Sequence, residues 1–108
     1  MQNTSPFLAM QQVERQLKAL LRSVDVDTLD KDERKAVATI RRLAADARLD
    51  IRDYELSETR EEQLKKMRAA QKRLVKLEAS MLSVGFAFGA ADIAQLSAQM
   101  EQINRWLL

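Results

Sequence analysis

The chain has 108 residues, of which 46% are hydrophobic and 31% charged, with one proline, two glycines, no histidine and no cysteine. This composition favours one all-α domain over residues 1–108, with residues 1–5 flexible, and argues against a β-rich fold. Lysine and arginine (18) barely outnumber aspartate and glutamate (16), so the net charge of +2 is weak support for nucleic-acid binding.

The missing residue types narrow the possible functions. Without histidine or cysteine, the chain lacks the commonest general base, the thiol nucleophile and the usual ligands of transition metals. We therefore expect no enzymatic activity, no cofactor and no metal. Nothing in the cysteine count ties the protein to an oxidising compartment, and the first residues lack a secretory signal, so we expect a cytoplasmic protein.

The first predicted helix follows a proline near the start of the chain. Thr4 or Ser5 can cap it, and Pro6 suits its first turn, where a missing N–H costs no hydrogen bond. Apolar residues then recur every three or four positions, at Met10, Val13, Leu17, Leu20 and Val24. This spacing predicts one buried face of an amphipathic helix.

The second predicted helix begins after a break at residues 23–30. Asp30 followed by Glu33 is typical of a capping box. The apolar stripe that follows comprises Val37, Ile40, Ala44, Ala47, Ile51 and Tyr54. This spacing again predicts a helix with one buried face.

Residues 57–63 separate the second stripe from the third and contain no apolar residue. A turn is favoured here, because Thr59 and Glu62 can form another capping box. Residues 30–84 could instead form one unbroken helix of about 80 Å, which would need a partner chain to cover it. Both alternatives stay open from the sequence.

Two further stripes complete the chain. The third comprises Leu64, Met67, Ala70, Leu74, Leu77, Met81 and Val84, and the fourth comprises Ile93, Leu96, Met100, Ile103 and Leu107. Asp92 and Gln95 are start signals for the last helix. Four stripes predict an antiparallel bundle of about four helices with a long central helical hairpin, and a coiled-coil-like, oligomeric form of this bundle stays open.

Both glycines lie in the stretch that joins the last two stripes. Gly85 and Gly89 are expected to adopt backbone angles that other residues resist, while Phe86 and Phe88 fold over the end of the bundle. The alternative is an exposed apolar loop that docks on a partner. The uncharged stretch 79–91 is too short to span a membrane, so no membrane span is expected.

The leading functional hypothesis is a non-enzymatic protein–protein interaction module, such as a small adaptor, regulator or assembly subunit. Leu49 and Leu56, with Ala38 and Ala45, fall opposite the main stripe of the second helix and could form a second packing face. The candidate partner-binding residues are Leu49, Leu56, Phe86, Phe88 and Trp106. The expected partner is a second copy of the chain or another helical protein.

The alternative hypothesis is a small helical nucleic-acid-binding protein. Five basic side chains follow the face of the third helix opposite its apolar stripe: Lys65, Arg68, Lys72, Arg73 and Lys76. Such a face can contact phosphates, but no aromatic residue lies between these side chains to stack on bases. Contact with the nucleic-acid backbone is therefore expected in preference to base recognition.

Overall fold

The computed structural model describes residues 5–84 and 89–107, and within these ranges it contains only helices and their connections. The helices are α1 (Pro6–Arg22), α2 (Lys31–Leu56), α3 (Arg60–Ser83) and α4 (Ala90–Leu107). A short 3-10 helix, η1 (Val26–Thr28), lies between α1 and α2. The all-α class predicted from composition and periodicity is confirmed.

Polar side chains begin the first two helices as the sequence predicts. The Ser5 hydroxyl accepts a hydrogen bond from the Leu8 N–H at 3.2 Å, and Pro6 occupies the first turn of α1. At α2 the capping box is complete: Asp30 accepts from the Glu33 N–H at 2.8 Å, and Glu33 accepts from the Asp30 N–H at 2.9 Å. These bonds satisfy backbone donors that have no partner inside a helix.

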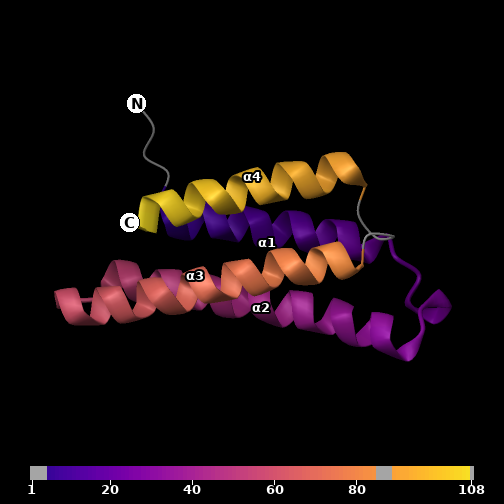
Figure 1. Cartoon of the computed structure of the whole chain (residues 1–108), viewed down its shortest axis with the longest axis horizontal. Helices are drawn as coiled ribbons and strands as arrows, with labels where there is room; N and C mark the ends of the chain where they lie inside the picture. The colour runs from indigo at the N-terminus through magenta and orange to yellow at the C-terminus, as the bar shows by residue number, and fades with distance from the viewer. Residues whose placement is uncertain (1–4, 85–88, 108) are drawn as a thin grey trace.

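The chain turns between α2 and α3, so residues 30–84 form a hairpin and not a single helix. The connection is residues 57–59, and Thr59 caps α3 by accepting from the Glu62 N–H at 3.2 Å. In Figure 1 the two helices lie side by side near their connection and diverge toward the start of α2, and they make the most extensive interhelical contact of the described chain. Each long helix therefore covers the apolar face of the other.

The start of α4 differs in detail from the prediction. The helix begins at Ala90, and Asp92 in its first turn accepts a hydrogen bond from the Gly89 N–H at 3.3 Å. The backbone φ of Gly89 is not positive, so the expectation that this glycine needs an unusual conformation is wrong. Gly85, Phe86 and Phe88 lie outside the described residues.

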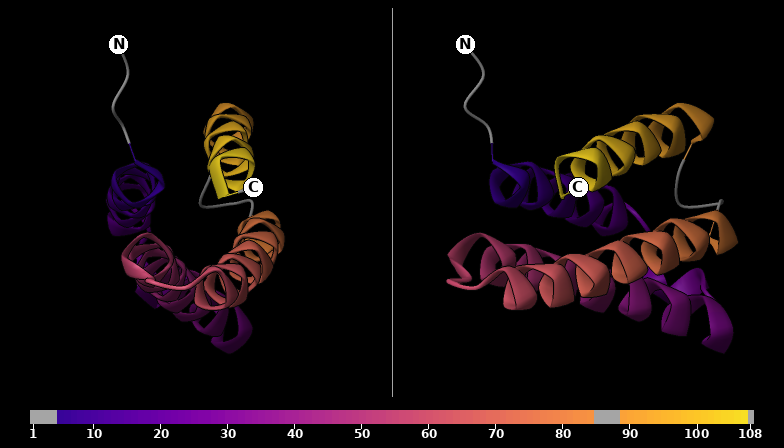
Figure 2. Two further views of the ribbon diagram at one scale, coloured as in Figure 1. Left: turned by 90° about the vertical axis from the view of Figure 1, so that its left-hand side faces the viewer. Right: turned by 60° about the vertical axis from the view of Figure 1, so that its left-hand side comes forward.

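The helices are arranged in chain order around a common centre, as the left-hand view of Figure 2 shows. The buried apolar side chains of all four helices form one cluster. Besides the hairpin, α1 packs on α2, and α4 packs on both α1 and α3. The contact between α3 and α4 is the sparsest of these. The chain measures 47 × 30 × 17 Å along its principal axes.

The core confirms most of the predicted stripes. Its largest fully buried side chains are Met10, Leu17, Leu21, Ile40, Ile51, Leu74, Leu77, Met81, Leu96, Met100, Ile103 and Leu107. The stripe of α1 is wrong at its end, because Leu21 is buried where the spacing selects Leu20 and Val24, which are only half-buried. Adjacent leucines at 20 and 21 satisfy the pattern almost equally, and packing decides between them.

Candidate interaction surfaces

Ion pairs between helices occupy several of the charged side chains. Arg48 of α2 donates to Glu14 of α1, with Nε and Oε1 2.8 Å apart. Arg73 of α3 donates to Asp50 of α2, with Nη1 and Oδ2 2.8 Å apart. Both carboxylates belong to residues that are only 7% exposed. Buried charges must be paired, so these four side chains serve the packing of the helices.

The environment of the Asp50 carboxyl disfavours its charged form. Burial raises its pKa above the ordinary value, and the nearby Asp46 and Asp53 carboxylates raise the pKa further. Arg73 and Lys66 oppose this effect without cancelling it. Arg73 is therefore committed to the helix interface.

This engagement removes Arg73 from the predicted basic face. Its Nη1 also lies 3.3 Å from the Asp46 carbonyl oxygen of α2, to which it donates. The four other predicted cations, Lys65, Arg68, Lys72 and Lys76, are exposed, and no ion pair involves them within residues 5–84 and 89–107. The basic face of α3 thus comprises four side chains, not five.

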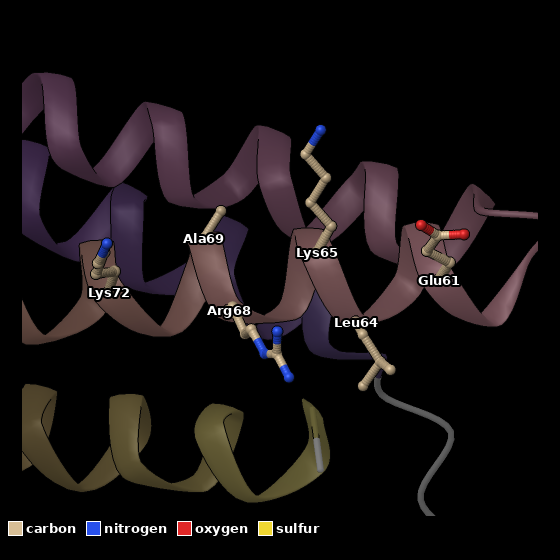
Figure 3. A pocket seen from close by; sticks show the side chains of 6 residues that line it. All are labelled: Glu61, Leu64, Lys65, Arg68, Ala69 and Lys72. Carbon is tan, nitrogen blue, oxygen red and sulfur yellow. The ribbon is translucent and has the colours of Figure 1, made fainter.

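A shallow depression lies on this part of α3, and Figure 3 shows the side chains around it. Its lining residues are Glu61, Leu64, Lys65, Arg68, Ala69 and Lys72. In Figure 3, Leu64 and Arg68 point to the side of α3 where α4 lies, whereas Lys65 points to the side of α2. Lys65 and Arg68 therefore lie at opposite edges of the basic face.

The predicted second face of α2 lies at the surface. Leu56 is 71% exposed, and Leu49, two turns earlier, is 36% exposed. Ala38 is also exposed, whereas Ala45 is half-buried. The two leucines share one side of the helix because they are seven residues apart.

A second exposed aliphatic pair lies on α3 and was not predicted. Val75 is 66% exposed and Leu82 is 62% exposed, both more than Leu49. They are separated by the same seven-residue interval as Leu49 and Leu56. From the sequence, apolar residues outside the buried stripe were considered only on the second helix. The same search on the third helix would have found Val75 and Leu82 by their seven-residue interval.

Val75 borders a groove between α3 and α4, the pair of neighbouring helices with the sparsest contact. The groove is lined by Leu74, Val75, Glu78, Met100, Glu101 and Asn104. The Oδ1 atom of Asn104 is buried and has no hydrogen-bond partner within the described part of the chain. The groove thus combines an apolar floor with two carboxylates and an unused acceptor.

The remaining predicted residues are scattered. Trp106, near the end of α4, is 39% exposed. Phe86 and Phe88 belong to the part of the chain that the structure does not describe.

Across residues 5–84 and 89–107, no cluster of three acidic side chains could hold a metal ion. In the same ranges, no helix is long and apolar enough to cross a membrane.

Comparison of the chain with protein-family models, with curated proteins and with solved structures gave no match.

Proposed function

We propose that this protein is a non-enzymatic protein–protein interaction module that acts through the outer faces of its helices. The observation that carries the proposal is the pair of aliphatic side chains left exposed on each helix of the hairpin, Leu49 with Leu56 on α2 and Val75 with Leu82 on α3. Single exposed aliphatic residues are common, whereas exposed apolar residues that gather on one face can mark an interaction site.

The proposed partner is a second copy of the chain or another helical protein. An up-down-up-down antiparallel bundle, with coiled-coil-like contacts between copies, would present both aliphatic pairs on straight helical faces. A role as a small adaptor, regulator or assembly subunit in the cytoplasm agrees with the lack of histidine and cysteine. Protein contacts need neither residue type.

Light scattering of the parent chain over a range of concentrations tests self-association. The variant L49K/L56K introduces two charges on α2, and L8K, at a residue that is 52% exposed on α1, is the control. Loss of mass in the α2 variant alone places the contact on α2. Two results together would contradict the proposal. The parent would have to be monomeric at every concentration, and isothermal titration calorimetry would have to detect no binding to any helical protein that co-purifies with it.

Nucleic-acid binding through α3 is the second candidate, and the four exposed cations Lys65, Arg68, Lys72 and Lys76 favour it. Four phosphate contacts would make the logarithm of the affinity for duplex DNA fall with the logarithm of salt concentration at a slope of about −3.6. Fluorescence anisotropy with a labelled duplex at several salt concentrations measures this slope. An absence of binding at low salt eliminates this candidate.

A further inference from the structure

One side of α3 carries six residues spaced alternately four and three positions apart. They are Leu64, Arg68, Gln71, Val75, Glu78 and Leu82, called here the α3 stripe. This spacing places them along one face of the helix, offset from the buried stripe toward α4. Arg68, Val75 and Leu82 are exposed, and the other three are half-buried.

The polar members of the α3 stripe have unused capacity for contacts. Within residues 5–84 and 89–107, neither Arg68 nor Glu78 takes part in an ion pair, and no side-chain hydrogen bond involves Gln71. Their charged or amide groups are thus available to a second molecule.

The positions of the α3 stripe are symmetric about position 73, which lies midway between 64 and 82, between 68 and 78, and between 71 and 75. Leucines lie at equal distances on either side, at 64 and 82, and opposite charges lie at 68 and 78. A helix with this order is complementary to an antiparallel copy of itself. Isologous twofold interfaces have this property, because residue i contacts j and j contacts i.

We infer that the α3 stripe is a twofold contact between two copies of this chain, with the two α3 helices antiparallel. In this register Leu64 packs against Leu82 of the partner subunit, and Arg68 faces Glu78 of the partner subunit. Each contact occurs twice, with Gln71 and Val75 at the centre. The inference rests on the proposed function and names both its partner and its surface.

Charge favours this register over the alternatives. Glu78 and Glu101 both line the groove between α3 and α4, so an incoming arginine meets two carboxylates. A parallel pairing of the same stripes would set Arg68 against Arg68 and Glu78 against Glu78, and like charges in direct contact disfavour a complex. The antiparallel pairing is the one that matches opposite charges at both ends.

The size of the contact fixes how strong it can be. Residues 64–82 extend over about 28 Å of helix, and one pair of helices of this length buries an area near the lower limit for specific complexes. The expected dimer is therefore reversible and depends on concentration. This agrees with a surface whose aliphatic members are exposed in the single chain.

Charge reversal gives a test that is specific to the register. In R68E the positions 68 and 78 carry the same negative charge, and in E78R they carry the same positive charge, so each variant alone should dimerise at least about tenfold more weakly than the parent. An equimolar mixture of R68E and E78R should recover the dimer, because both facing pairs are then of opposite sign. The double variant R68E/E78R should also recover it.

Sedimentation velocity measures these masses, and circular dichroism confirms that each variant keeps its helix content. K76E is the matched control, because Lys76 is exposed on α3 away from the stripe and should leave the dimer unchanged. Parent-like dimers in both single variants, or no dimer in the mixture, overturn the inference. If L49K/L56K alone abolishes the dimer, self-association occurs through α2 and only the α3 contact is wrong. A monomeric parent overturns the α3 contact and all self-association, and it leaves another helical protein as the one partner that the proposed function allows.

Discussion

The buried ion pair between α2 and α3 should respond asymmetrically to the loss of its two members. Removing the cation by R73M keeps much of the apolar stem of the side chain but deletes the donors to Asp50 and to the Asp46 carbonyl. The Asp50 carboxylate, whose side chain is 10% exposed, then remains charged without its main partner. Fully buried pairs lose about 3–5 kcal/mol in this way. The Arg73 side chain is 38% exposed, so solvent screening lowers the expected loss to about 1–2 kcal/mol.

Removing the anion should cost much less. D50N keeps an oxygen that can accept from Arg73 and eliminates the charge that burial disfavours. At neutral pH we expect its free energy of unfolding to lie within about 1 kcal/mol of the parent, on either side.

The pH dependence has a definite sign. The pKa of Asp50 is raised in the folded protein, so the folded state binds its proton more tightly than the unfolded state does. The stability that this group contributes is complete below its ordinary pKa of 3.8 and is lost as pH rises through the raised value. The parent should therefore gain stability relative to D50N as pH falls from neutral through that window.

Urea unfolding followed by circular dichroism, at neutral pH and at several acidic values, measures all three proteins. Equal losses for D50N and R73M at neutral pH would show that the Asp50 charge is a net stabiliser, which contradicts the reasoning. A parent that loses stability relative to D50N as the pH falls would contradict the reasoning as well.

Four further substitutions test the fold by the same urea assay. L77A should lower the free energy of unfolding by about 2–5 kcal/mol because Leu77 is fully buried. K72E, at an exposed site, should change it by less than about 0.5 kcal/mol. Equal effects would mean that the buried and exposed faces of α3 are misassigned. D30A removes half of the capping box and should cost about 1 kcal/mol, and an unchanged midpoint would count against the cap. G89A should be neutral or stabilise by up to about 1 kcal/mol, because an added Cβ would meet only the Asp92 carboxylate oxygen at 3.5 Å and no positive φ is involved; a loss above that value would restore the conformational role first expected of this glycine.

Local signals explain why the helices could be predicted from the sequence. A cap such as Asp30 with Glu33 acts within one turn of helix, so its residues are adjacent in the chain and readable there. The break before Thr59 was predicted for the same reason, although a continuous helix stayed open. Caps and apolar spacing are properties of one segment, and they do not depend on how the segments are oriented.

The side-chain environments at the edges of each buried stripe could not be predicted in the same way. Arg73 and Arg68 are both basic residues of α3, yet Arg73 turns to Asp50 of α2 while Arg68 stays exposed. The rotation of a helix about its own axis, relative to its neighbours, decides which of them is covered. That rotation results from packing of several helices at once, as does the choice of Leu21 over Leu20 in α1.

Arg68 belongs to both of the proposed contact surfaces, and this overlap would make the two proposed functions compete. In the proposed antiparallel dimer the guanidinium would face Glu78 of the partner subunit, and on a nucleic acid the same group would contact a phosphate. One cation cannot satisfy both partners, so a duplex bound to α3 should shift the protein toward monomer by mass action. Sedimentation of the parent with and without duplex measures this shift, and the K76E variant separates the effects, because Lys76 belongs to the basic face but not to the α3 stripe. A duplex that binds without changing the dimer fraction would mean that the phosphate contacts and the twofold contact use different sides of α3.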